Sequence, residues 1–319
     1  MRIIFMGTPF FAVPSLKALT ESKHNVAAIV TKIDKPSGRG YQITQSPVKK
    51  VASECKIPIL QPKSIKTPEF EAELKGYNPD IIIVSAYGKI LPKNILDLPS
   101  KGCYNIHASL LPKYRGAAPI HWALVNGEKE TGITIMKMVE ELDAGDIILT
   151  KKIYIEENDN VGTLHTKLSH LGAEAIIEAL ELIESGKAIP IPQDLSKSTF
   201  APMIKKSDGA INWSYSSDNI INLIRGMNPW PGAYCNINTK MIKVLKAQKC
   251  EEVHATSFPG IVVKMYKDEG PVIKTGDGAV VLLEVQPENK KVMSGKDFIN
   301  GSYVHIADIC GKVVFEQNE

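Results

Sequence analysis

Apolar runs alternate with helical patterns over about the first 190 residues of the chain. Asp80–Ser85 is a β-branched run that is apolar on both faces, which is typical of a parallel strand covered by helices on both sides. Gly162–Ser185 repeats its apolar residues at helical spacing and predicts a long amphipathic helix. A shorter helix is predicted over Ala12–Ser22, and further strands are predicted over Arg2–Gly7, Asn25–Thr31, Pro58–Leu60, Gly102–His107 and Gly132–Val139. Strands that alternate with helices favour an α/β fold with a Rossmann-like, doubly wound, mostly parallel sheet.

The pattern changes after residue 189. Prolines and hydroxyl residues replace the periodicity and predict a linker over residues 190–207, between one domain at 1–189 and a second at 208–319. Beyond it, one short helix at Ser217–Arg225 is followed by short strand-like runs. They are Met241–Ala247, Gly260–Met265, Val272–Thr275, Ala279–Glu284 and Val304–Ile306. Short strands separated by turns indicate a small β-barrel.

Composition narrows the class of protein. With 319 residues, 44% of them hydrophobic and 23% charged, the chain is long enough for about two globular domains of ~150 residues. No apolar run approaches the ~20 residues of a membrane span, and the start lacks the pattern of a signal peptide. Five scattered cysteines favour reduced, packing thiols. We therefore expect a cytoplasmic protein, and a monomer because no sustained heptad is present.

Candidate chemistry is concentrated at the end of one predicted strand. Asn105 and His107 are two residues apart, so their side chains point to the same side, at the carboxyl end where α/β sheets bind ligands. Asp143 follows in a glycine-containing loop. An amide, an imidazole and a carboxylate can together run acyl transfer without a covalent nucleophile. A lone Asn, His or Asp at such a position is more often a capping or turn residue than a catalyst, so the pattern by itself leaves both readings open.

A resemblance changes the balance between these readings. The run Asn105–Pro112 (Asn-Ile-His-Ala-Ser-Leu-Leu-Pro) and the downstream Leu142–Asp146 (Leu-Asp-Ala-Gly-Asp) closely resemble two motifs of the 10-formyltetrahydrofolate-dependent formyltransferase family. The resemblance implies that Asn105, His107 and Asp143 form a catalytic trio. It implies 10-formyltetrahydrofolate as the formyl donor, and no metal is needed.

The same resemblance extends to the donor's binding residues. Ser109, Leu110, Leu111 and Pro112 match the family's folate-contacting turn. The strand-end segment Ser85–Pro92 is similar to the segment that lines the pterin pocket. Its residues expected at that pocket are Tyr87, Gly88, Lys89, Ile90 and Leu91.

A basic loop follows the second predicted strand. Lys32–Lys50 carries five basic residues against one acid, Asp34, and glycine lies on both sides of Arg39. A merely solvated basic loop is the alternative to a nucleic-acid contact. The loop resembles the one by which the family members that formylate methionyl initiator tRNA approach the acceptor end. That resemblance implies a contact of Arg39 with initiator methionyl-tRNA, supported by Lys35 and Lys49.

The second half resembles the OB-like domain that these tRNA-directed members carry, with Asn228–Tyr234 at its start. The lysines at positions 240, 243, 246 and 249 could face phosphates or be solvated barrel residues. From residue 205 onward, 14 basic and 13 acidic residues nearly cancel, so the predicted tRNA-binding domain is not basic overall. The net charge of the whole chain, +3, does not by itself indicate a nucleic-acid partner.

Three other functions compete with this one. The nearest is a formyltransferase that acts on a nucleotide-linked amino sugar, against which the basic loop argues. A dinucleotide-dependent oxidoreductase is disfavoured because the first strand-to-helix turn, Gly7–Ala12, lacks the G-x-G-x-x-G pattern. A non-catalytic nucleic-acid-binding protein would leave the trio without a purpose.

Overall fold

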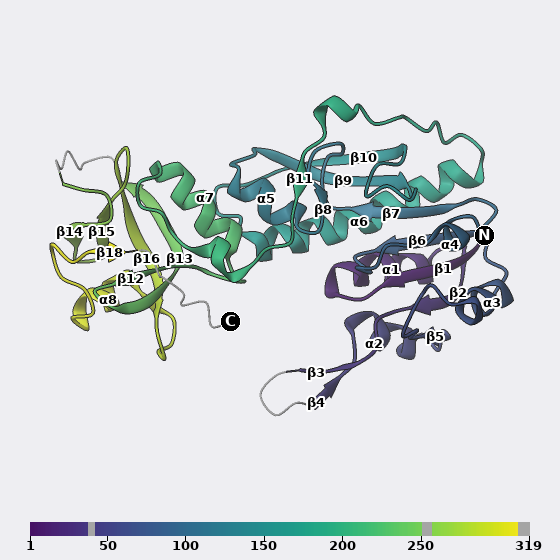
Figure 1. Ribbon diagram of the computed structural model, residues 1–319, viewed down its shortest axis with the longest axis horizontal. Coiled ribbons are helices and arrows are strands. Elements are labelled where there is room, and N and C mark those ends of the chain that lie inside the picture. The colour runs from purple at the N-terminus through teal and green to yellow at the C-terminus, as the bar shows by residue number, and fades with distance from the viewer. Residues whose placement is uncertain (38–41, 251–256, 312–319) are drawn as a thin grey trace. The chain divides into compact units, whose positions relative to one another are not determined.

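The computed structural model describes residues 1–37, 42–250 and 257–311 (Figure 1). The chain divides into two compact units. Unit 1 consists of Met1–Pro119, Glu130–Tyr154 and His165–Pro202, and unit 2 of Ile120–Lys129, Ile155–Leu164 and Met203–Glu319. Two short pieces from the predicted first domain, 1–189, thus belong to unit 2, which the sequence pattern did not indicate. In the described part of the chain, no helix is long and apolar enough to cross a membrane.

Unit 1 is built on a seven-stranded sheet with the order β10-β9-β7-β6-β1-β2-β5. Its parallel strands are β1 (Arg2–Gly7), β2 (Asn25–Val30), β5 (Ile59–Leu60), β6 (Ile81–Ser85) and β7 (Cys103–His107). Two antiparallel strands, β9 (Glu130–Lys137) and β10 (Ile147–Tyr154), extend it beyond β7. The predicted α/β class and mostly parallel sheet are confirmed.

Helices cover both faces of this sheet, as the two-sided apolar strands require. The helices are α1 (Val13–Glu21), α2 (Pro47–Glu54), α3 (Pro68–Gly76), α4 (Lys93–Leu96) and α6 (Val161–Glu184), with a 3₁₀ turn at Phe10–Ala12. On one face, Phe70 of α3 packs in a core cluster with Ile4 of β1 and Ile82 of β6. On the other face, Gly172 lets α6 approach β7 closely, since a Cβ there would lie 3.0 Å from Ile106 Cγ2.

Two small sheets complete unit 1. β3 (Lys35–Ser37) pairs with β4 (Gln42–Thr44) at the predicted basic loop. β8 (Arg115–Gly116) pairs in parallel with β11 (Phe200–Ala201), and a 3₁₀ turn at Leu195–Lys197 precedes β11. Part of the predicted linker is therefore hydrogen-bonded to unit 1.

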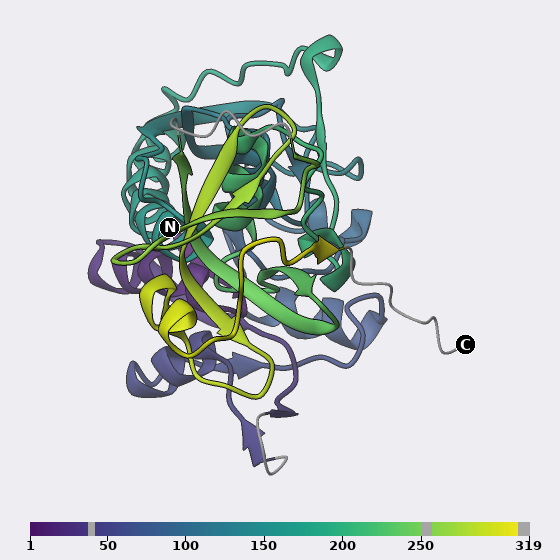
Figure 2. The same cartoon turned by 90° about the vertical axis from the view of Figure 1, so that its left-hand side faces the viewer.

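Unit 2 contains a curled antiparallel sheet with the order β14-β15-β16-β13-β12-β18 (Figure 2). The strands are β12 (Ala233–Ile237), β13 (Lys240–Cys250), β14 (Val262–Tyr266), β15 (Gly270–Lys274), β16 (Ala279–Pro287), β17 (Met293–Ser294) and β18 (Cys310–Gly311). A bridge between Ile261 and Ile309 joins the residues next to the first and last strands. The sheet thereby closes on itself, which confirms the predicted barrel.

The remaining helices among the described residues are α5 (Pro119–Val125), α7 (Ser217–Met227) and α8 (Gly295–Asn300), with a 3₁₀ turn at Lys206–Gly209. The helix predicted at Ser217–Arg225 is confirmed as α7. The strand predicted at Val304–Ile306 is wrong. Ser302 and Ala307 take positive φ values of 53° and 72°, and this left-handed backbone on both sides turns the chain where a strand would have to extend.

The sequence pattern also missed strands β10 and β12. β10 alternates half-buried and exposed residues at the edge of its sheet, so its apolar signal is weaker than that of the central strands.

Candidate active site

The structure brings together the three residues of the predicted trio. Asn105 and His107 lie at the carboxyl end of β7, and Asp143 lies in the loop between β9 and β10. The Asn105 Nδ2 atom is 3.4 Å from Asp143 Oδ1, and His107 Nδ1 is 3.7 Å from Asp143 Oδ2. The carboxylate therefore faces both partners. All three residues belong to unit 1.

His107 is buried, and both of its ring nitrogens face acceptors. Nε2 lies 2.9 Å from the backbone carbonyl oxygen of Tyr114. Because a carbonyl oxygen only accepts, Nε2 carries a hydrogen and donates it. Nδ1 then faces the Asp143 carboxylate. The contact of Nε2 with Tyr114 thus fixes the orientation of the ring with Nδ1 toward Asp143.

Asp143 adopts a left-handed backbone conformation, with φ at 48°. The loop around it requires glycine, since a Cβ on Gly145 would overlap the carbonyl oxygen of Lys137. The backbone N–H of Gly116 donates to Asp143 Oδ2 over 2.8 Å. This contact comes from the loop that follows β7, so both loops of the site define the position of the carboxylate.

Two residues that the sequence did not single out support this loop. Arg115 is 2% exposed, and its guanidinium donates to the side-chain oxygen of Gln193 from Nη2 over 2.8 Å. Gln193 in turn donates to the backbone carbonyls of Asp143 and Gly145. No pattern in the sequence pairs these residues, because Gln193 lies in the irregular stretch predicted as a linker.

The segment expected to contact folate, Ser109–Pro112, is tied down by its own neighbours. Thr134 of β9 donates to the backbone carbonyl of Ser109 over 2.7 Å and accepts from the N–H of Leu111 over 3.2 Å. Ser109 Oγ donates to the carbonyl of Lys113. Leu110 and Pro112 are half-buried and Leu111 is buried, so this turn is ordered by polar contacts beneath it.

The second expected folate segment follows β6, the parallel neighbour of β7. Ala86 and Gly88 have positive φ values of 48° and 70°, and they reverse the chain on both sides of Tyr87. Tyr87 is 1% exposed, and burial raises the pKa of its hydroxyl to about 12. Lys89 donates to the carbonyl of Pro62, and Leu91 is buried, whereas Ile90 is 70% exposed. Because β6 and β7 are parallel, both segments begin at the same edge of the sheet.

The Cys103 thiol is not arranged for nucleophilic chemistry. Burial raises the pKa of Cys103 to about 12, and its Sγ faces backbone carbonyls of α4. Among residues 1–37, 42–250 and 257–311, no three His, Cys, Asp or Glu side chains are grouped in a way that could hold a metal ion. The site offers an amide, an imidazole and a carboxylate side by side next to the carboxyl end of β7, a set suited to direct transfer of an acyl group to an amine.

Comparison with known proteins supports this chemistry. Residues 1–180 match the formyl transferase family, and residues 203–303 match the C-terminal domain of formyl transferases. The chain belongs to the formyl transferase family.

Similar proteins include methionyl-tRNA formyltransferases. That of Caldanaerobacter subterraneus subsp. tengcongensis is 51% identical over 302 residues, covering 94% of this chain and 97% of the relative. Among solved structures, the N-formyltransferase of Helicobacter canadensis in complex with folinic acid and dTDP-3-aminofucose has a TM-score of 0.66 at 20% identity. That similarity covers 89% of this chain and 98% of that one.

A further structure with this fold is HypX from Aquifex aeolicus in complex with tetrahydrofolic acid. It has a TM-score of 0.63 and 20% identity, and the similarity covers 99% of this chain. The chain spans about half the length of HypX, 51%. Identities of this size show a shared fold and no more.

The basic loop of this formyl transferase is only partly described. Arg39 lies outside the described residues. Lys35 begins β3 and is exposed. Lys49, in the first turn of α2, forms an ion pair with Asp34 and donates to Gln61 over 2.7 Å. The hydrogen bond from Lys49 holds the pKa of the Asp34 carboxyl below its usual value. Lys49 therefore anchors the base of the loop, and its expected contact with tRNA stays a prediction.

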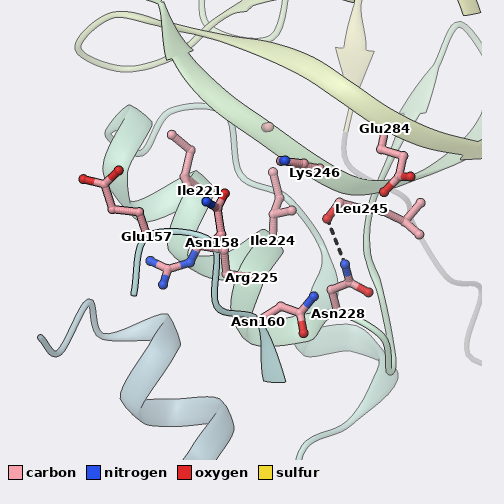
Figure 3. Close-up of a pocket in the computed structure, with 11 residues that line it drawn as sticks. Glu157, Asn158, Asn160, Ile221, Ile224, Arg225, Asn228, Leu245, Lys246 and Glu284 are labelled. Carbon is pink, nitrogen blue, oxygen red and sulfur yellow. Dashed lines mark hydrogen bonds between the residues drawn. The ribbon is translucent and has the colours of Figure 1, made fainter. Parts of the chain in front are cut away.

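Unit 2 of the formyl transferase contains a separate pocket of about 320 Å³ (Figure 3). It is lined by Glu157, Asn158, Asn160, Ile221, Ile224, Arg225, Asn228, Leu245, Lys246, Ala247 and Glu284. Arg225 at its wall donates to the backbone carbonyls of Glu156 and Asp159. Two β13 lysines are also engaged within unit 2, since Lys249 pairs with Asp218 and Lys243 donates to the carbonyl of Pro231. These cations therefore have partners within unit 2.

The contact between Gly116 and Asp143 generates a first prediction. A Cβ on Gly116 would lie 2.9 Å from the carbonyl oxygen of Ala201, and its φ is 115°. Gly116→Ala should shift the N–H that holds the carboxylate and lower the turnover of formyl transfer about 100-fold, as misplacement by ~1 Å can. Initial rates and melting temperatures would be measured together.

Gly186→Ala is the matched control, because Gly186 has a φ of 69° and nothing within 4 Å of an added Cβ. It should share the backbone strain and keep turnover. Equal loss of turnover in both variants would show that strain, and not the Asp143 contact, is responsible.

Proposed function

We propose that this formyl transferase transfers the formyl group of 10-formyltetrahydrofolate to the α-amino group of methionine on initiator tRNA, in support of translation initiation. The observation that carries the acceptor is the 51% identity, over 94% of this chain, to a methionyl-tRNA formyltransferase. The amino-sugar enzyme is a distant neighbour at 20% identity. Because the acceptor takes part in translation, we infer a cytoplasmic location. The expected monomeric state stays a prediction.

The donor assignment has support from the fold and from the site. HypX, a structural neighbour, was solved with tetrahydrofolic acid, and the Helicobacter canadensis enzyme with folinic acid. In this chain the turns at 87–91 and 109–112 begin at one edge of the sheet, beside Asn105 and His107. We infer that the pterin is read by the first of these turns and that the second contacts the folate, which places the formyl group at the trio.

The reaction forms one carbon–nitrogen bond and breaks another. The neutral α-amino group, with an ordinary pKa of about 8, attacks the formyl carbon and produces a tetrahedral oxyanion. Collapse of that intermediate breaks the bond between the carbon and the folate nitrogen. The proton lost by the amine goes to the leaving folate nitrogen, so charge and atoms balance without an outside reagent.

Asn105 and His107 stabilise the oxyanion. The hydrogen bond from Asn105 to Asp143 is long, at 3.4 Å, so the amide can turn to a better acceptor at small cost. Nε2 of His107 is held by the Tyr114 carbonyl, which leaves Nδ1 as the nitrogen that serves the reaction. One donor to such an oxyanion is worth about 3 kcal/mol in comparable enzymes.

Asp143 orients His107 and relays the amine proton. Its carboxylate lies 3.7 Å from Nδ1 and faces that side of the imidazole ring. Gly116 holds the same carboxylate oxygen, so the acceptor of the proton stays in place through the reaction.

The acceptor assignment is tested by offering the enzyme three acceptors with labelled 10-formyltetrahydrofolate. Initiator methionyl-tRNA should be labelled, whereas elongator methionyl-tRNA and a nucleotide-linked amino sugar should not. The counts in acid-precipitated tRNA and in the separated sugar nucleotide measure this directly. Labelling of the sugar alone would refute the assignment of the acceptor and would still support the assignment of the formyl donor.

The roles in the trio predict large losses of turnover. Asn105→Ala and Asp143→Asn should each lower kcat at least about 100-fold, because each removes a group that acts in the transition state. KM for tRNA should change little. Glu140→Gln makes the same carboxylate-to-amide change at an exposed position of the same loop and should be silent. Near-normal turnover of folded Asn105→Ala and Asp143→Asn would refute the mechanism.

Arg39 is proposed to contact a tRNA phosphate near the acceptor end. Arg39→Ala should weaken tRNA binding and reduce the slope of log affinity against log salt by about one. Lys187→Ala, which removes an exposed cation after α6, is the control and should leave both unchanged. Fluorescence anisotropy of labelled tRNA between low and high salt measures the two slopes, and an unchanged slope for Arg39→Ala would remove the loop from the interface.

A further inference from the structure

Residues 191–201, here called the strap, are bonded to both loops that build the active site. At one end, Ile191 forms a backbone bridge with Ile147, at the start of β10 and directly after the Asp143 loop. At the other end, Thr199 accepts the N–H of Tyr114, and β11 pairs with β8. The strap therefore runs between the Asp143 loop and the loop that follows β7, within unit 1.

Gln193 is the side chain of the strap that reaches the Asp143 loop. Its Nε2 donates to the carbonyl of Asp143 over 2.8 Å and to that of Gly145 over 2.7 Å. Its Oε1 accepts from Arg115 Nη2 over 2.8 Å and from Arg115 Nε over 3.2 Å. Both hydrogens of the amide and both lone pairs of its oxygen are thus in use. A side chain of any other type cannot supply two donors and two acceptors from this position.

Arg115 gives this cluster its rigidity. The guanidinium is 2% exposed, and a buried charge that lacks partners is costly. The distance from Arg115 Nη1 to Glu141 Oε1, 3.5 Å, is long, and the Glu141 side chain is 70% exposed. Gln193 therefore accepts a close hydrogen bond from the buried Arg115 guanidinium. Because the same side chain also donates to the Asp143 loop, it links that loop to Arg115.

The backbone of Asp143 needs this support. A non-glycine residue at positive φ costs of order 1 kcal/mol or more, and it persists where its surroundings fix it. The carbonyl of Asp143 is held by Gln193, and its carboxylate by Gly116. Two anchors on opposite sides of one residue determine the direction in which the carboxylate faces His107.

We propose that Gln193 is a positioning residue for formyl transfer. Held in place by Arg115, it keeps Asp143 in its left-handed conformation and so keeps the Asp143 carboxylate directed at His107. It touches neither substrate nor the reacting atoms. The proposal rests on the proposed function for its activity assay alone, since the position of the loop can be measured without any acceptor.

The test compares three variants of the full chain. Gln193→Met keeps the length of the side chain and removes all four hydrogen bonds. Gln193→Glu keeps acceptors for Arg115 and removes both donors to the carbonyls of Asp143 and Gly145. Leu195→Ala changes a 61% exposed residue of the same strap and is the matched control.

Both Gln193 variants should lower kcat about 30-fold or more, with KM for tRNA and for the formyl donor within about twofold. Gln193→Glu should be as impaired as Gln193→Met, because the donors to the loop are what matters. Hydrogen exchange of the amides of residues 141–146 in the free enzyme should speed up at least tenfold in both variants. Leu195→Ala should match the wild type in all these measurements.

Several outcomes would overturn the proposal. Normal kcat per folded enzyme, with a lower melting temperature alone, would make Gln193 a structural residue. Rescue of kcat by Gln193→Glu would show that neutralising Arg115 is its task. Unchanged hydrogen exchange at 141–146 would exclude the role of Gln193 in holding the Asp143 loop, even if the wild type labelled no tRNA. If the wild type labels no tRNA and exchange is faster in the variants, the acceptor assignment is refuted and the role of Gln193 in holding the loop is kept.

Discussion

When a parallel sheet carries apolar residues on both faces, the carboxyl ends of its strands are where polar side chains can be presented. In unit 1, helices cover both faces of β1, β6 and β7, and the strands carry buried side chains almost throughout. Polar groups can therefore be presented where the parallel strands end. Asn105 and His107 stand at that end of β7, and the turns at 87–91 and 109–112 leave the sheet beside them. The position of the whole site follows from this constraint.

The carboxyl end of β7 supplies Asn105 and His107, and Asp143 must be brought to them from another loop. Asp143 comes from the loop between two antiparallel strands, where nothing in the sheet itself fixes its direction. The direction is set instead by backbone and side-chain polar contacts: the N–H of Gly116 on the carboxylate, and the amide of Gln193 on the carbonyl. Buried Arg115 connects these contacts into one network. Such a network, once satisfied, rigidifies the site it surrounds.

Unit 2 shows why lysine counting is a weak guide to nucleic-acid binding. Two of the four β13 lysines have partners inside unit 2, and the 14 basic residues from position 205 onward are matched by 13 acidic ones. Whether a lysine on the surface of such a barrel is available to a phosphate depends on the acidic and carbonyl groups next to it. The same holds in unit 1, where Lys49 is neutralised by Asp34 at the base of the basic loop.

The sequence determined the class of fold and the family, and it predicted the trio. Local patterns carry these: apolar runs such as Ile81–Ser85, the helical spacing of α6, and the two motifs around His107 and Asp143. It did not determine β10, the turn at 304–306, or the contacts of residues 191–201. The edge strand β10 has fewer buried apolar residues than the central strands, and the apolar run at 304–306 is interrupted by turns on both sides. Gln193 meets Asp143 across 50 residues of chain. Only the tertiary structure decides such a contact, because hydrogen bonds between distant polar side chains and backbone leave no period in the sequence.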